Sequence, residues 1–405
     1  MTIPDAAQTS HPELSQRLAE LAPIIDVAAD EAELRGELGA GVIDALQEHG
    51  VFLLMAPKAV GGAEANHRDL IDVISGLSYT DGSTGWTAMA VMLAVGIVGA
   101  YFGDDAVDAV FAPDRVANGT FLIAGQAQPR GKAERVGDGY RVSGSFGFGS
   151  GSHHASWMLG GFVLHEAGEP VRTANGPKVL FGLVPGDLVE LRGNWDVMGL
   201  RATGSDDYWI PEQVVPVDYL VEMENPAPQR GGELYHMGRK ALTALSHASF
   251  PLGVAQRSLD ELQVLSHRKK RVPGGLYMYQ PTFQRDFAEA TAALSSARAY
   301  VRESFDRLLE ASREAPIPPK LKADVRLAAS HAVQVGVSVT HYAYLAAGSD
   351  GLRNFSTDAE GRRGNRLQRA FRDMHAASQH LFTAEQTFLD TGQVFLEVPD
   401  ASVYL

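Results

Sequence analysis

YRVSGSFGFGSGSHHASW, from Tyr140 to Trp157, alternates apolar with small or polar residues and then becomes glycine-rich. The alternation has the period of a strand with one buried face. Three closely spaced glycines remove side chains and let a ligand approach the backbone: Gly147, Gly149 and Gly151. Phe148 and Ser150 lie between them, and in an extended chain their side chains point to the same side. Two interpretations are open: a hairpin with glycine bulges, which the spacing alone favours, and the wall of a site for a flat ring.

The composition is that of an ordinary folded, soluble enzyme. The 405 residues are 45% hydrophobic and 21% charged, with 42 glycines and no low-complexity tract. A chain of this length usually divides into two or three subdomains. The net charge of −14 argues against nucleic acid as the main partner, because phosphate binding needs a basic surface.

The sequence also bears on compartment and membrane. It contains no cysteine, so disulfides, thiolate nucleophiles and cysteine metal sites are excluded. The N-terminus has no basic region followed by an apolar core, so we expect no secretory signal and a cytoplasmic location. The long apolar stretch Trp86–Phe102 has about the minimum length of a membrane span. It is rich in Ala and Gly, so we expect a buried helix there and no membrane partner.

Three regions of different texture follow one another. Apolar residues at helical spacing come first, then short β-branched and aromatic runs separated by glycine turns, then long amphipathic helical patterns. We expect an N-terminal helical domain over 1–115, a central β domain over 116–225 and a C-terminal helical bundle over 226–405. No GxGxxG opens a helix after a strand, and GxxxxGK[ST], GxSxG and HExxH are absent. The chain therefore shows no nicotinamide, serine-hydrolase or zinc-protease signature.

Several motifs in order resemble the acyl-CoA dehydrogenase superfamily over nearly the whole chain. They are Ala45–Gly50 with Ala56–Gly62, Lys132–Tyr140 leading into the opening segment, Met198–Ser205 with Val215 and Pro216, and Gly253–Leu262 with Gln284–Ala288. The resemblance implies an α+β fold: an N-terminal α-helical domain, a central β-barrel or sandwich domain and a C-terminal four-helix bundle.

The same resemblance implies a flavin site. Phe148 falls where a tryptophan often packs on the flavin, and Ser150 where a hydroxyl bonds flavin N5. Trp86 resembles a flavin-proximal position of the monooxygenase branch, although an ordinary core position is an equal alternative. Gln126 and Gly151 are further flavin-binding candidates. The cofactor is FAD or FMN, with FAD slightly favoured by the dehydrogenase-like length.

The catalytic carboxylate of the dehydrogenases has no counterpart at the matching positions. The dehydrogenases resemble one another in having this glutamate shortly after an Arg-Asp pair. Here the corresponding pair is Arg372-Asp373, and the residue that follows at the glutamate's place is His380. The alternative glutamate site would fall near Thr243–Leu245, which has none. The dehydrogenases' TEPxAGSD loop is replaced by the shorter Ala124–Gly131.

A histidine at this late position resembles the group D flavin monooxygenases, the oxygenase components of two-component systems such as p-hydroxyphenylacetate hydroxylase and dibenzothiophene monooxygenase. They use flavin reduced by a separate NAD(P)H-dependent reductase and react with O2 through a C4a-hydroperoxyflavin. An imidazole with an unperturbed pKa of ~6.5 can donate and accept protons near neutrality. The resemblance thus makes His380 the flavin-facing acid or hydrogen-bond donor, with Ser150 as the second catalytic candidate.

Other histidines have weaker support. His375 is about 140° around a helix from His380, so the two are not expected to meet one atom; His375 either contacts substrate or merely packs. His153 and His154 are adjacent rather than at i, i+4 spacing, so we expect no metal site.

The basic run His267–Arg271 is the only strong one in the chain. Such a run is usually a solvated helix end. In the resembling fold this stretch contacts flavin phosphates, often across a subunit interface, so Arg268 and Arg271 are phosphate candidates. The resemblance also implies a homotetramer, a dimer of dimers.

The substrate side of the site is apolar in the sequence. Phenol hydroxylases of this group carry a histidine on the helix after the tryptophan, whereas Thr87–Ala94 has only small and apolar residues apart from its threonine. Met89, Met92 and Leu93 are the substrate-binding candidates, and they favour an apolar or fused aromatic molecule such as an indole. N-hydroxylation and sulfoxidation stay open. Two alternatives also remain: a dehydrogenase-type flavin oxidoreductase and a non-enzymatic flavin-binding scaffold.

Overall fold

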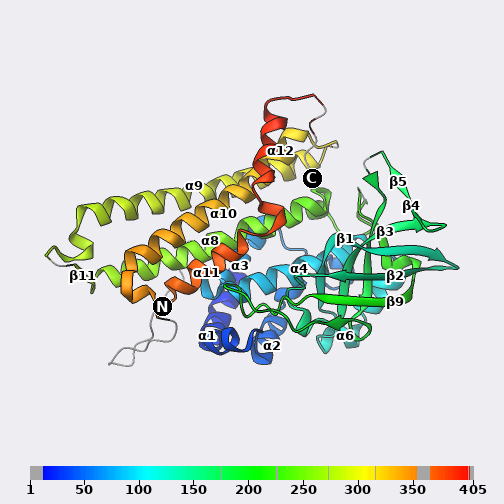
Figure 1. The fold of residues 1–405 in the computed structure, drawn as a ribbon, viewed down its shortest axis with the longest axis horizontal. Helices are drawn as coiled ribbons and strands as arrows, with labels where there is room; N and C mark the ends of the chain where they lie inside the picture. The colour runs from blue at the N-terminus through cyan, green and yellow to red at the C-terminus, as the bar shows by residue number, and fades with distance from the viewer. Residues whose placement is uncertain are drawn as a thin grey trace.

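The computed structural model describes residues 12–174, 176–224, 227–271, 273–314, 316–353, 365–399 and 401. Helices come first, a β-sheet follows, and long helices complete the chain (Figure 1). The sheet lies at one end of the molecule, and the long C-terminal helices extend away from it. The predicted order of helical, β and helical regions is confirmed.

Six helices form the N-terminal region. Their bounds are α1 Pro12–Arg35, α2 Ala40–Glu48, α3 His67–Thr80, α4 Gly82–Tyr101, α5 Asp104–Val110 and α6 Pro113–Ala117. Side-chain caps start the two central helices: Asn66 accepts a hydrogen bond from Asp69 N at 3.0 Å, and Asp81 from Thr84 N at 2.8 Å. Since α3 and α4 are joined by the single residue Asp81, this cap also fixes the angle at which α4 begins.

Helix α4 is the core helix of this region. In length and composition it could span a membrane, but 89% of its apolar window is buried inside the protein. It packs against α3 and α8 (Arg239–Ser266). The prediction of a buried helix over the apolar stretch is confirmed.

One mixed sheet forms the central region. Its strands are β1 Ile123–Val136, β2 Gly139–Phe146, β3 Trp157–Glu166, β4 Glu169–Pro170, β7 Val179–Pro185, β8 Glu190–Leu191, β9 Tyr208–Pro216 and β10 Leu220–Glu222. The order is β10-β7-β3-β1-β2-β9-β8, with β4 pairing β3. Two short two-stranded sheets join β5 Arg172–Thr173 to β6 Gly176–Pro177, and β11 Lys270–Arg271 to β12 Gly275–Leu276. The predicted barrel or sandwich is thus a single sheet whose end strands, β10 and β8, do not pair.

Four of the remaining helices pack on one another in the C-terminal region. They are α8, α9 Pro281–Ser312, α10 Pro319–Ala347 and α11 Leu367–Ala377, with the shorter α7 Glu233–His236 and α12 Gln386–Phe395 beside them. The three long helices lie side by side in Figure 1. Because α8 also packs on α3 and α4, this helix joins the bundle to the N-terminal helices.

Candidate active site

The indole of Trp86 binds the hydroxyl of Ser150. Trp86 lies in the first turns of α4, and Ser150 lies in the loop that follows β2. Trp86 Nε1 donates a hydrogen bond to Ser150 Oγ at 3.1 Å, and both residues are buried. The fold therefore joins two residues that the sequence nominated separately.

Two imidazoles complete this group. The Trp86 ring has its centroid 5.5 Å from that of His247, 5.8 Å from that of His380 and 5.1 Å from that of Phe250. The rings of His247 and His380 are only 4.1 Å apart. We call Trp86, Ser150, His247, Phe250 and His380 the Trp86 cluster. Its members come from α4, the loop after β2, α8 and the segment after α11.

Hydrogen bonds to the backbone fix the tautomers of the two imidazoles. His247 Nδ1 lies 2.8 Å from the Thr243 carbonyl, which can only accept, so Nδ1 carries the proton. His380 Nδ1 accepts from the Phe382 N–H at 3.2 Å, so its proton is on Nε2. In their neutral forms the pair thus offers one donor, His380 Nε2–H, beside one acceptor, His247 Nε2.

Both imidazoles are neutral at neutral pH. Burial lowers the pKa of His247 to about 4; the Thr243 hydrogen bond opposes this shift, and the Arg326 charge contributes to it. Burial, His247 and Arg326 together hold the pKa of His380 well below its ordinary value. The sequence argument, which used the unperturbed pKa, is therefore corrected: His380 is a neutral hydrogen-bond donor, because its surroundings disfavour a second proton.

Arg326 and Phe382 form the outer side of the pair. The Arg326 guanidinium lies 3.6 Å from the centroid of the Phe382 ring, and its Nη2 donates to Thr387 Oγ1 at 3.0 Å. The Phe382 ring is 5.8 Å from that of His247. Burial is the main reason that both imidazoles stay unprotonated, and this nearby cation adds to its effect.

Phe148 does not lie where an extended strand would put it. Strand β2 ends at Phe146, and Phe148 has a left-handed backbone with φ of 64°. Its ring is 65% exposed and meets the Trp195 ring edge-on at 6.1 Å, whereas Ser150 is buried. The prediction that the Phe148 and Ser150 side chains point to the same side is wrong, because the chain turns between them. Phe148 is therefore an exposed aromatic side chain two residues before Ser150.

The residues around Ser150 fit a flat polar ring such as a flavin. Gly151 has φ of 79°, and a Cβ there would lie 3.0 Å from Val91 Cγ2 and 3.2 Å from Thr87 Cγ2. The Thr87 hydroxyl is buried and has no hydrogen-bond partner in the described part of the chain. A Cβ at Gly151 would press on these two α4 side chains, so the glycine lets the Ser150 loop pack closely on α4. A ligand with hydrogen-bonding edges at this loop would supply the missing partner of the Thr87 hydroxyl.

The structure does not bring every predicted residue to the cluster. His375 Nδ1 bonds the Phe371 carbonyl at 2.8 Å, and its ring packs on Phe371 and His341. Helix α11 ends at Ala377, so the helical angle assumed between His375 and His380 does not apply. The two histidines nevertheless have different neighbours, as expected. The structure gives His375 no contact with Trp86 or His247 among the described residues.

The basic run lies at the far end of α8. Arg268 and Arg271 are exposed, and Arg271 belongs to β11. At 1.5 Å per residue, Arg268 is about 30 Å from His247 along the helix. A single chain therefore does not join these arginines to the Trp86 cluster.

The apolar substrate candidates on α4 divide between two faces. Leu93 lies two turns after Trp86, on the same face, and is partly buried. Met89 is one turn away on an adjoining face, and Met92 points about 120° away; both are fully buried in the main core. Both methionines are thus better explained by core packing. Gln126, on β1, is held through its N–H by the Tyr208 hydroxyl at 3.1 Å.

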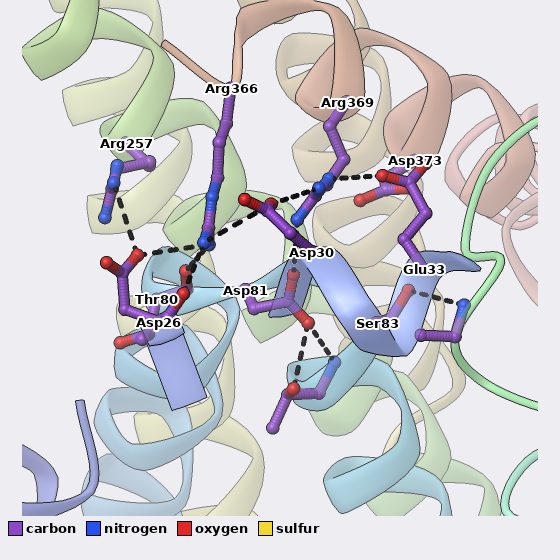
Figure 2. A network of polar contacts seen from close by, with 12 residues as sticks. Asp26, Asp30, Glu33, Thr80, Asp81, Ser83, Arg257, Arg366, Arg369 and Asp373 are labelled. Carbon is purple, nitrogen blue, oxygen red and sulfur yellow. Dashed lines mark hydrogen bonds and ion pairs between the residues drawn. The ribbon is translucent and has the colours of Figure 1, made fainter. Parts of the chain in front are cut away.

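Buried ion pairs fix α11, and with it the segment that carries His380, against the N-terminal helices (Figure 2). Arg369 on α11 pairs with three carboxylates: Asp30 at 2.6 Å, Glu33 at 2.7 Å and Asp81 at 3.6 Å. Asp81 is the cap of α4, so one guanidinium ties α1, α4 and α11 together. This arrangement sets where the chain leaves α11 toward His380.

Asp373 on α11 adds a second link. Its Oδ1 accepts the Leu200 N–H at 2.6 Å, and the carboxyl is buried. Burial raises the pKa of Asp373 to about 7, with Asp81 adding to the rise and the Leu200 hydrogen bond opposing it. Gly199 allows the close approach, since a Cβ there would lie 2.1 Å from the Arg372 carbonyl oxygen.

The sequence argument missed His247. The residue belongs to the stretch inspected for the alternative glutamate, and it lies one turn after Thr243 on the same helix face. That spacing of one helical turn was the signal in the sequence that could have identified His247 as a candidate site residue. Phe250, Ser205 and Arg326 were missed as well, because nothing local distinguishes them from ordinary core residues.

Comparison with known proteins identifies the family to which this chain belongs. Residues 18–119 match the acyl-CoA dehydrogenase N-terminal domain, and residues 245–385 match the acyl-CoA dehydrogenase C-terminal domain. The chain belongs to the acyl-CoA dehydrogenase family, as predicted.

The relatives are oxygenases. The chain is 28% identical over 382 residues to indole-3-acetate monooxygenase of Pseudomonas putida, covering 92% of each chain. It is also 28% identical over 394 residues to the oxygenase component of an FADH(2)-dependent resorcinol hydroxylase of Rhizobium sp., covering 93% of this chain and 92% of that one. Its fold matches 3-HSA hydroxylase from Rhodococcus sp. RHA1 with a TM-score of 0.85 at 24% identity, over 97% of this chain and 98% of that one. The predicted likeness to the two-component monooxygenases is confirmed.

Proposed function

We propose that this protein is the oxygenase component of a two-component flavin-dependent monooxygenase. It takes reduced flavin and O2 and inserts one oxygen atom into an aromatic small molecule; the second oxygen leaves as water and the flavin leaves oxidised. The observation that carries the proposal is the neutral imidazole pair His247 and His380, in a place where a dehydrogenase needs a carboxylate. No carboxylate is among the groups that set the pKa of either imidazole.

The residues of the Trp86 cluster have distinct tasks. Bound reduced flavin would supply the two electrons for oxygen activation. Ser150 and Trp86 would hold the polar edge of the ring, and Phe148 would cover its face. His380 Nε2–H and His247 Nε2 would hold a group that both donates and accepts a hydrogen bond. The burial of Trp86, His247 and Phe250 would exclude water from it.

Flavin delivery implies partners. The FADH2 complex of XiaF from Streptomyces sp. and the FMN-bound structure of TdsC from Paenibacillus sp. A11-2 have this fold. We take the cofactor of this chain to be FAD or FMN, reduced by a separate NAD(P)H-dependent flavin reductase in the cytoplasm. Arg268 and Arg271 are far from the cluster of their own chain, which supports a phosphate contact supplied by a second copy, in a homotetramer.

The substrate we propose is indole-like. Leu93 and Phe250 provide apolar surface near Trp86, and α4 carries no ionisable group between Trp86 and Tyr101. Relatives from Pseudomonas putida and Acinetobacter baumannii are indole-3-acetate monooxygenases, and a structure of indole-bound TdsC has the same fold. An electron-rich indole needs no phenolate-forming base, which agrees with this surface.

The test is a product assay with purified protein and photoreduced FAD or FMN. Indole, indole-3-acetate, phenol-type and thioether substrates are supplied with 18O2, and products are identified by mass spectrometry. We expect one 18O in an indole-type product. The absence of labelled product from all substrates, together with anaerobic bleaching of bound oxidised flavin by an acyl thioester, would instead establish a dehydrogenase.

A further inference from the structure

A chain of buried hydroxyls runs from Ser150 to a backbone carbonyl. Ser150 Oγ lies 2.7 Å from Ser205 Oγ, which lies 2.6 Å from Thr203 Oγ1. Thr203 Oγ1 in turn bonds the Leu200 carbonyl at 2.8 Å. Ser205 and Thr203 are each 2% exposed, so bulk water does not compete for these hydroxyls.

The hydrogen bonds of this hydroxyl chain can be donated in only one direction, from Ser150 toward Leu200. A carbonyl can only accept a hydrogen bond, so Thr203 donates its single hydroxyl proton to the Leu200 carbonyl. Ser205 must then donate to Thr203, and Ser150 must donate to Ser205. Each hydroxyl has one proton, so no hydrogen of Ser150 is left for a ligand.

Trp86 completes the assignment. Its Nε1–H donates to Ser150 Oγ at 3.1 Å and occupies one of the two acceptor positions of that oxygen. One lone pair of Ser150 is left. Toward a ligand, Ser150 is therefore an acceptor only.

The Leu200 carbonyl, which accepts the hydrogen bond of Thr203, is held rigidly. Leu200 has a left-handed backbone with φ of 55°, and its N–H is bound by Asp373 Oδ1 at 2.6 Å. Its carbonyl also accepts from the Trp195 indole Nε1 at 3.1 Å and from Thr203 N at 3.2 Å. The Leu200 carbonyl, which sets the direction of the hydrogen bonds, is thus fixed by Asp373 of α11 and by two further donors.

We propose that Ser205 and Thr203 are positioning residues that turn Ser150 into an obligate hydrogen-bond acceptor, so that the site selects reduced flavin over oxidised flavin. The inference rests on the proposed function, with Ser150 at flavin N5 as the family resemblance implies. Reduced flavin carries a hydrogen on N5 and donates there, whereas oxidised flavin has only a lone pair at N5. An acceptor pairs with the first and opposes the second.

The selection suits an enzyme that receives its flavin from another protein. Oxidised flavin is the product of each turnover, and a site that opposes it releases it for the next reduced molecule. The hydroxyl chain supplies this preference without a charged residue, which agrees with the neutral imidazoles beside it.

Two variants should free the hydroxyl proton of Ser150. Thr203→Val is nearly isosteric and removes the acceptor of Ser205, which can then donate back to Ser150 and free the Ser150 proton. The Leu200 carbonyl keeps two donors in this variant. Ser205→Ala frees the Ser150 proton directly. Ser152→Ala is the matched control, because Ser152 is equally buried on the same loop but bonds only the Gly204 carbonyl, at 3.1 Å.

The experiment compares dissociation constants for oxidised and photoreduced FMN and FAD under argon, and the midpoint potential of bound flavin by dye equilibration. Wild type and Ser152→Ala should bind reduced flavin more tightly. In Thr203→Val and Ser205→Ala the ratio of oxidised to reduced dissociation constants should fall about tenfold, the size of one hydrogen bond. The bound potential should then become about 30 mV more negative for this two-electron couple.

The outcomes separate the two proposals. A wild-type protein that binds neither flavin form overturns the proposed function and this inference with it. A wild type that prefers reduced flavin, with an unchanged ratio in both variants that fold by circular dichroism, overturns only the role of the hydroxyl chain.

Discussion

The imidazole rings of His247 and His380 lie 4.1 Å apart at an interplanar angle of 33°, with their protons on different nitrogens. One ring comes from the first third of α8, and the other from the segment after α11. Their contact places one donor, His380 Nε2–H, and one acceptor, His247 Nε2, near Trp86. The proposed chemistry depends on this pair, and the predictions below begin with it.

Removing the His380 ring should uncouple the enzyme. In His380→Ala the donor Nε2–H is lost, and we expect product formation to fall about 100-fold, as for other pre-positioned donors. Flavin oxidation should continue and yield hydrogen peroxide in place of product. His380→Gln, which retains an N–H donor, should keep part of the coupling. The measurement is product and peroxide per flavin oxidised.

The control for this substitution is His165→Ala, since His165 lies on β3 and bonds the Val163 carbonyl at 3.0 Å. It should couple like wild type. Equal coupling in His380→Ala and wild type would refute the role of His380.

The imidazole pair should titrate in acid. Nitrogen NMR of labelled protein should give His247 a pKa of about 4, because burial and Arg326 disfavour its charged form. In Arg326→Gln the pKa values of His247 and His380 should both rise, since a nearby positive charge is lost. Values near that of free histidine in the wild type would contradict the buried, neutral pair.

Asp373 should make stability depend on pH. Burial raises its pKa from 3.8 unfolded to about 7 folded, so the native state keeps a proton that the unfolded state has released. This contribution to stability is complete below the unfolded pKa and is lost as pH rises through the folded pKa. We expect Asp373→Asn to gain stability relative to wild type as pH rises from about 4 to about 7.

Urea unfolding of both proteins across this pH range measures the effect, and the difference between the two free energies of unfolding removes the contribution of the histidines. The asparagine can still accept the Leu200 N–H. A difference that does not change with pH would show that Asp373 is ionised throughout.

Gly151 and Gly137 allow a matched comparison. Both have positive φ, 79° and 56°, so alanine at either position should cost about 1–2 kcal/mol of stability. A Cβ on Gly137 meets nothing within 4 Å, whereas one on Gly151 meets Val91 and Thr87. We expect only Gly151→Ala to weaken the binding of reduced flavin, measured by anaerobic titration. Equal flavin affinity in the two variants would contradict a ligand at this loop.

The sequence predicts the broad architecture because helices, strands and turns each follow from a local pattern of residues. The helical spacing of α8 and α10 and the glycine turn at Gly137 are visible without tertiary information. The sheet order is less accessible, since the parallel pairing of β1 with β3 depends on contacts between distant segments.

The site was only partly predictable. Trp86, Ser150 and His380 were named through resemblance, and the fold joins them. The pairing of His380 with His247 follows from the way α8 packs, which no local pattern encodes. The left-handed turn at Phe148 was missed for a related reason: a bulky residue rarely adopts positive φ, so the sequence favoured an extended strand.

The central claim, that this chain controls the reaction of reduced flavin with O2, is tested most directly by anaerobic stopped-flow mixing of the protein–reduced flavin complex with oxygenated buffer and indole-3-acetate. We predict that oxidised-flavin absorbance returns much more slowly than for free flavin, with oxygenated product formed, and that His380→Ala restores rapid oxidation with peroxide release. Oxidation at the free-flavin rate in wild type, with stoichiometric peroxide and no product from any substrate tested, would contradict the account.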